Sequence, residues 1–146
     1  MDEVDRQILD VLRRDARTPY TEIADEIGTS EGTVRNRVES MIEEGVIERF
    51  TVATRTGNVK AMVEIDVDVN VHTEGVTEEM ADWPEVDFVW QVSGEEDIVL
   101  VADAADTSSL NELITRARER EEVLSTKTRL ILDEWLGRRA APPSGE

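Results

Sequence analysis

Arg35, Asn36 and Arg37 follow one another in the chain, and their side chains suit the recognition of nucleic-acid bases. An Arg guanidinium can donate two hydrogen bonds to guanine, and an Asn carboxamide pairs in a similar way with adenine. Ser30 and Thr33, one turn earlier, carry hydroxyl groups that can contact phosphates or bases. If these residues share a helix face, they predict a surface that enters the major groove of double-stranded DNA.

The same stretch has a second interpretation, because Glu31 and Glu39 balance the charge of the two arginines. Acidic and basic residues four positions apart on a helix form ion pairs on a solvated face. Ser30 is also a suitable helix N-cap, and that role takes precedence over phosphate contact. Both interpretations stay open from the sequence alone.

Other kinds of chemistry find little support. The chain has no Cys and only one His, His72, which excludes disulfides, thiol nucleophiles and Cys-based zinc sites. The carboxylates show no spacing typical of a metal site or an acid–base pair, and no nucleophile–base set is present. We therefore expect a protein that is not an enzyme and that needs no metal or other cofactor.

The charge balance points to an unusual solvent. There are 34 Asp and Glu against 16 Lys and Arg, a net charge of −18, and only Lys60 and Lys127 are lysines. The acids are spread along the chain, which favours a salt-adapted cytoplasmic protein, since about 1 M salt shortens the Debye length to about 3 Å. The acidity also limits electrostatic attraction to DNA. No apolar run approaches the ~20 residues of a membrane span.

The elements that must position Arg35 to Arg37 are helices. Apolar periodicity predicts a helix over 3–15, a second over 20–27 and a third over 30–44, with Gly28-Thr29-Ser30 as the turn of a helix-turn-helix. Thr18 followed by Pro19 predicts the N-cap of the second helix. The stretch 46–52 is β-prone and would add a wing.

The second half alternates strands with helices in the order β-α-β-β-α-β, which predicts a ferredoxin-like domain with two helices on one face of an antiparallel sheet. Strands are expected over 60–71, 86–93, 97–102 and 123–132, and helices over 73–81 and from an N-cap at Thr107. Alternation puts Val86, Phe88, Trp90 and Val92 on one face. Trp83 and Trp90 are expected in the core or at a dimer interface. Domain boundaries are expected at 1–52, 53–59 (linker), 60–136 and 137–146 (disordered tail).

These residues carry a resemblance to a known family. The stretch from Val4 to Ile47, VDRQILDVLRRDARTPYTEIADEIGTSEGTVRNRVESMIEEGVI, is similar to the helix-turn-helix of Lrp/AsnC (feast/famine) transcriptional regulators. Val92-Ser93-Gly94 followed by Asp97, and Thr126 to Leu132, resemble a turn and the last strand of that family's C-terminal domain. The acidic, lysine-poor composition resembles that of a haloarchaeal member.

The resemblance implies an α+β fold, a winged helix-turn-helix followed by a ferredoxin-like domain of the RAM or ACT type. It also implies a regulator that binds pseudo-palindromic DNA as a homodimer, with further assembly into tetramers or octamers. Amino acids or other small effectors would bind between C-terminal domains. Candidate effector residues are Gly94, Asp97, Thr126 and Thr128, each with a purely structural alternative in a turn or strand. The alternative function is a small-molecule-sensing oligomer that acts through protein contacts.

Overall fold

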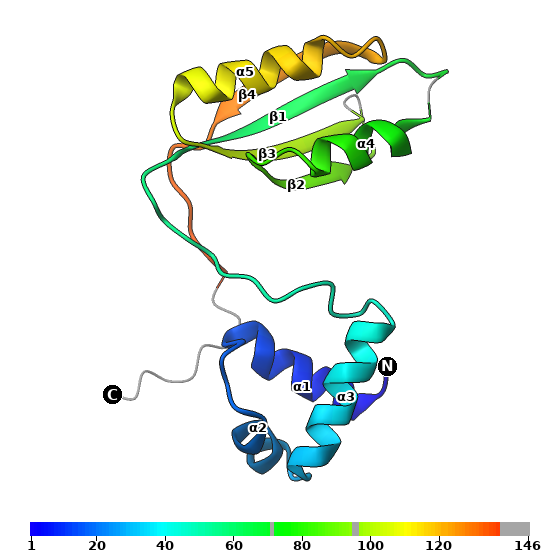
Figure 1. The fold of residues 1–146 in the computed structure, drawn as a ribbon, viewed down its shortest axis with the longest axis vertical. Coiled ribbons are helices and arrows are strands. Elements are labelled where there is room, and N and C mark those ends of the chain that lie inside the picture. The colour runs from blue at the N-terminus through cyan, green and yellow to red at the C-terminus, as the bar shows by residue number, and fades with distance from the viewer. Residues whose placement is uncertain (71, 95–96, 138–146) are drawn as a thin grey trace. The chain divides into compact units, whose positions relative to one another are not determined.

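The computed structural model describes residues 1–70, 72–94 and 97–137, which form two compact units (Figure 1). The helical unit comprises Met1–Ala53 and the chain from Trp135, and the sheet unit is Thr54–Glu134. The predicted linker thus has most of its residues inside the sheet unit. Of the tail predicted over 137–146, only Gly137 lies within the described residues.

Three helices make the helical unit, as the periodicity predicts. They are α1 (Glu3–Arg14), α2 (Tyr20–Ile27) and α3 (Glu31–Glu43). Their apolar faces meet in one cluster, in which Ile8, Ile23, Val34 and Val38 are fully buried. Fully burying a side chain of this size contributes about 1.5–3 kcal/mol, so these contacts fix the angle between α2 and α3.

The turn between α2 and α3 has the predicted geometry, whereas the start of α2 does not. Gly28 adopts the left-handed conformation, with φ of +76°, and ends α2. The Ser30 hydroxyl caps α3 by accepting the Thr33 N–H at 3.1 Å. The N-cap of α2 is Pro19 and not Thr18, because the Thr18 hydroxyl donates instead to the Asp15 carbonyl at 2.7 Å.

The predicted wing is absent from the described residues, where 46–52 contain no strand. Only Ile47 is anchored, through an N–H bond to the Met41 carbonyl at 3.0 Å and burial in the helical core. A strand requires a partner for its backbone hydrogen bonds, and no described segment of this chain supplies one. The N-terminal domain is therefore a helix-turn-helix without a wing.

The sheet unit has the predicted β-α-β-β-α-β order (Figure 1). Its elements are β1 (Val59–Val67), α4 (Thr73–Ala81), β2 (Val86–Gln91), β3 (Ile98–Ala104), α5 (Thr107–Arg118) and β4 (Val123–Leu130). The strands are antiparallel in the order β2-β3-β1-β4. Alternate residues of β1 and β3 are buried against α4 and α5, so both helices cover one face of the sheet.

Three strands end earlier than predicted, among them β2 at Gln91 and not at 93, while β3 continues to Ala104. One helix has a different cap. β1 ends at Val67, just after a register shift against β4, and Val69 is exposed. Val71, which was predicted to continue this strand, lies outside the described residues. β4 ends at Leu130 and not at 132. Asp106, and not Thr107, caps α5 by accepting the Ser109 N–H at 2.7 Å.

The prediction that Val86, Phe88 and Trp90 share a face was wrong. The register of β2 against β3 shifts between Val86 and Phe88, which turns the later residues over. Val86 and Val89 pack against the core, while Phe88 and Trp90 stack with ring centroids 5.4 Å apart on the opposite face. Trp90 is 47% exposed and is therefore not a core residue of this chain.

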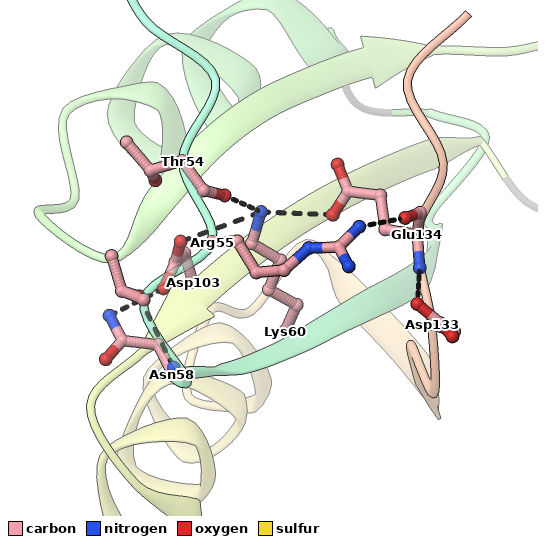
Figure 2. A network of polar contacts seen from close by, with 8 residues as sticks. Thr54, Arg55, Asn58, Lys60, Asp103, Asp133 and Glu134 are labelled. Carbon is pink, nitrogen blue, oxygen red and sulfur yellow. Dashed lines mark hydrogen bonds and ion pairs between the residues drawn. The ribbon is translucent and has the colours of Figure 1, made fainter.

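A polar cluster joins the points where the chain enters and leaves the sheet unit (Figure 2). The Nζ of Lys60 lies 3.0 Å from a Glu134 carboxylate oxygen, 4.0 Å from Asp103 and 3.4 Å from the Thr54 carbonyl oxygen. Bonding to Glu134, offset in part by desolvation, raises the pKa of Lys60. Lys60 thus contacts the first and the last residue of the sheet unit, Thr54 and Glu134.

Candidate nucleic-acid interface

The orientation of α3 follows from which of its residues are buried. Val34, Val38 and Met41 point into the helical core, so the opposite face of the helix lies outside. The predicted contact residues lie on the N-terminal half of this helix. Ser30, Arg35 and Asn36 are exposed, and Thr33 and Arg37 are half-buried. The five residues thus share the N-terminal half of α3 but not one face, since Arg35 and Arg37 lie roughly 200° apart around the helix.

Ser30 and Thr33 are engaged with each other at the start of α3. Their hydroxyl oxygens are 2.9 Å apart, and the Ser30 oxygen also accepts the Thr33 N–H. The capping interpretation of Ser30 is therefore confirmed. Each hydroxyl keeps further hydrogen-bonding capacity, since a hydroxyl has one donor and two acceptor positions.

Arg35 lies between groups from two helices. Its Nη2 pairs with the Glu31 carboxylate one turn earlier, as the spacing predicts. Its Cζ also lies 5.5 Å from the centroid of the Tyr20 ring at the start of α2. An arginine within about 6 Å of an aromatic face is attracted to the ring quadrupole. Periodicity alone could not reveal the ring contact, because it depends on how α2 crosses α3.

Arg37 turns toward α1 and not toward a glutamate of its own helix. Its Nη1 lies 2.5 Å from Asp2 Oδ2 and 3.4 Å from Asp5 Oδ1. Asp2 and Asp5 also form a capping box, in which each carboxylate accepts the other's backbone N–H at 3.0 Å. The Asp5 N–H and the Arg37 guanidinium together lower the pKa of Asp2 to about 2.

The effector candidates at the turn between β2 and β3 have structural roles. Gly94 has φ of +124°, a conformation that L residues rarely adopt. The Asp97 carboxylate accepts the Val67 N–H at 3.1 Å, and its own N–H donates to the Ile65 carbonyl. Burial and the nearby Asp97 carboxylate raise the pKa of Asp66. Residues 95–96, between Gly94 and Asp97, lie outside the described residues.

Thr126 and Thr128 lie in β4, opposite Ile65 and Val63 of β1. The Thr126 hydroxyl accepts the Arg118 Nε–H at 2.9 Å. Asp97 bonds to Ile65 of β1 from the β3 side, whereas Thr126 and Thr128 lie on the β4 side. β1 therefore separates the two threonines from Asp97 and Gly94. Within one described chain, these four residues do not converge on one pocket.

The described residues also limit other site types. They contain no group of three or more acidic or histidine side chains placed to hold a metal ion. None of the helices in this part of the chain is long and apolar enough to cross a bilayer.

Two family models divide the chain between a DNA-binding and a ligand-binding module. Residues 1–42 match the AsnC-type helix-turn-helix domain, and residues 60–141 match the Lrp/AsnC ligand binding domain. This combination defines a helix-turn-helix transcriptional regulator with a ligand-binding domain. The chain belongs to the Lrp/AsnC family.

Relatives and solved structures agree with this assignment. The chain is 38% identical over 136 residues to the HTH-type transcriptional regulator LysM of Sulfurisphaera tokodaii, covering 92% of this chain and 97% of the relative. It is 34% identical to LysM of Saccharolobus solfataricus, covering 92% and 96%. The Mycobacterium tuberculosis leucine response regulatory protein (LrpA) superposes with a TM-score of 0.80 at 25% identity, covering 94% and 97%.

Escherichia coli AsnC superposes with a TM-score of 0.72 at 25% identity, covering 94% of this chain and 96% of that one. The matched domains and relatives are regulators and not enzymes, which agrees with the predicted non-enzymatic role. The organisms named are not haloarchaea, so the haloarchaeal resemblance stays a prediction.

Proposed function

We propose that the outer face of α3 reads base edges in the major groove, through Arg35 and Asn36, with Ser30 and Thr33 near the phosphates. The observation that carries this proposal is the exposure of Arg35 and Asn36 on the helix that follows the turn, outside the buried face of Val34, Val38 and Met41. Arg37 completes the predicted set of contacts. Its pairing with Asp2 and Asp5 leaves part of its fork of N–H donors for a phosphate.

The protein acts, in this proposal, as a homodimer, with tetramers or octamers as further assemblies. The sheet face opposite α4 and α5 carries the stacked Phe88 and Trp90, which are 52% and 47% exposed. Their β3 neighbours Val101 and Val99 extend this apolar area. Large aromatic side chains on an exposed patch are typical of protein–protein interfaces. A two-fold dimer would present two α3 helices to a pseudo-palindromic site.

We further propose that the C-terminal domain binds an amino acid or another small metabolite, and that binding shifts assembly or DNA affinity. The match to a ligand-binding domain supports this. Gly94, Asp97, Thr126 and Thr128 remain candidates for a site completed where copies of the chain meet. The test is a thermal-shift screen of the 20 standard amino acids at fixed protein concentration, because a ligand that binds only the native state raises its melting temperature.

The composition supports a fourth proposal, that the protein works in the cytoplasm of a salt-accumulating cell. A net charge of −18 with two lysines favours high ionic strength, where self-repulsion is screened. Far-UV circular dichroism should show helix lost as KCl is dialysed away. A chain that stays folded and dimeric in dilute buffer would contradict this proposal.

The DNA contact can be tested with duplexes selected from a random library by the wild-type chain in 2 M KCl. We expect Arg35→Ala with Asn36→Ala to lose most of the binding to the selected duplex, measured by fluorescence anisotropy. Arg6→Ala is the matched control, since Arg6 is an exposed, ion-paired arginine of the same unit. Unchanged binding by the double variant would show that Arg35 and Asn36 do not read the duplex. A wild-type chain that selects no duplex would favour the alternative, a sensor that acts through protein contacts.

A further inference from the structure

We propose that Tyr20 and Glu31 are positioning residues, which hold the Arg35 guanidinium in the orientation that α3 presents to a DNA base. This inference rests on the proposed contact between Arg35 and DNA. It adds residues from outside the predicted contact set, and one of them belongs to a different helix.

Tyr20 supplies a fixed surface for the guanidinium. It is the first residue of α2 and is partly buried against the helical core, which restrains its ring. The Arg35 Cζ lies 5.5 Å from the ring centroid, within the distance over which an arginine is attracted to an aromatic face. The position of the Arg35 head group is therefore coupled to the start of α2.

Glu31 restrains the same group from its own helix. Its carboxylate accepts a hydrogen bond from Arg35 Nη2, four residues away. A guanidinium has five N–H donors in a planar fork, so one bond from Nη2 to Glu31 leaves a neighbouring pair of N–H groups, the second Nη2 donor with Nη1 or with Nε, that can reach a base. The two contacts of Arg35 differ in kind. The aromatic face of Tyr20 restrains the plane of the guanidinium, whereas the Glu31 carboxylate restrains one of its edges.

Such restraint affects recognition because an arginine side chain loses rotamer freedom when it binds. A guanidinium that is already held in the binding orientation loses less, and this preorganisation appears as affinity. It also sharpens discrimination, since a correctly aimed fork fits guanine and fits other bases poorly. Arg37 differs, because its guanidinium is directed toward Asp2 and Asp5 of α1.

The experiment uses the full-length chain, the duplex selected by wild type in 2 M KCl, and variants of that duplex with each base pair changed in turn. Tyr20→Leu removes the aromatic face and keeps an apolar side chain, whereas Tyr20→Phe keeps the ring and serves as the matched control. We expect Tyr20→Leu to weaken binding roughly tenfold, the range of a cation–π contact. Discrimination should fall only at the base pairs where Arg35→Ala also loses it, and Tyr20→Phe should behave as wild type.

A double-mutant cycle separates positioning from folding. Adding Tyr20→Leu to Arg35→Ala should cause no further loss of binding, and Glu31→Gln should flatten discrimination at the same base pairs. The inference is overturned if Tyr20→Leu weakens all duplexes equally, if it weakens binding in the Arg35→Ala background, or if it changes nothing. A wild-type chain that selects no sequence would instead overturn the proposed function.

Discussion

Arg37 Nη1 lies 2.5 Å from Asp2 Oδ2, although 35 positions separate the two residues in the sequence. This contact ties the middle of α3 to the first turn of α1. Asp5, which is largely buried, is the other carboxylate of the capping box and also contacts Arg37 Nη1. Arg35 and Arg37 therefore differ in role despite being two residues apart, since Arg37 also fastens the three-helix core.

The first prediction concerns this fastening role. Arg37→Ala should lower the melting temperature of the helical unit more than Arg35→Ala does. The reason is that it leaves the carboxylates of Asp2 and Asp5 without their cation, and Asp5 is mostly shielded from water. Thermal unfolding followed by circular dichroism at 222 nm in 2 M KCl would measure the difference. Equal melting temperatures for the two variants would show that the cluster adds no more stability than the contacts of Arg35 with Glu31 and Tyr20.

A second prediction follows from the pKa of Asp2, which falls from 3.8 to about 2 on folding. A carboxyl group with a lowered folded pKa stabilises the native state above its unfolded pKa. That stability is lost as pH falls from about 4 toward 2. Asp2→Asn should reduce this acid-dependent loss, measured as the change in melting temperature between pH 5 and pH 2.5, while Asn still caps α1. An identical pH profile for the variant and wild type would contradict the assignment.

The two lysines allow a third prediction with an internal control. Lys60→Met should destabilise the sheet unit by about 1 kcal/mol, the upper range for partly exposed ion pairs, because Lys60 bonds to Glu134 and lies near Asp103. Lys127→Met, on the exposed edge strand β4, should change stability by less than about 0.5 kcal/mol. Urea unfolding in 2 M KCl measures both. If the Lys127 variant loses as much as the Lys60 variant, the cluster in Figure 2 is not stabilising.

The fourth prediction addresses assembly. Trp90→Glu should convert the proposed dimer to monomer, because it introduces a charge into an exposed aromatic pair that the partner would bury. Light scattering after size-exclusion chromatography gives the mass directly. Trp90→Phe keeps an apolar ring and should remain dimeric. A dimeric Trp90→Glu variant would place the interface elsewhere.

Much of the fold could be predicted because the signals are local. Ser30 and Gly28 act on their own backbone neighbours, so the cap and the end of α2 follow from residue type. The alternation of Val63 and Ile65 depends only on strand geometry. The domain order β-α-β-β-α-β followed from such patterns and was confirmed.

The errors came from effects that a single segment does not encode. The bulge between Val86 and Phe88 depends on pairing with β3, and it reverses the face on which Trp90 lies. The predicted wing at 46–52 failed because a strand needs a partner segment. The same limit applied to the candidate site, where the contacts of Arg35 with Tyr20 and of Arg37 with Asp2 join different helices.

The central claim is that Arg35 reads a base edge in the major groove, and base analogues test it most directly. Each guanine of the selected duplex would be replaced in turn by 7-deazaguanine, which lacks the N7 acceptor. Affinities of wild type and Arg35→Ala would then be measured in 2 M KCl. We predict that at least one replacement weakens wild type about tenfold, because one of the two hydrogen bonds of a bidentate contact is lost, and leaves Arg35→Ala unaffected. A wild-type chain insensitive to every replacement, or a variant equally sensitive, would contradict the claim.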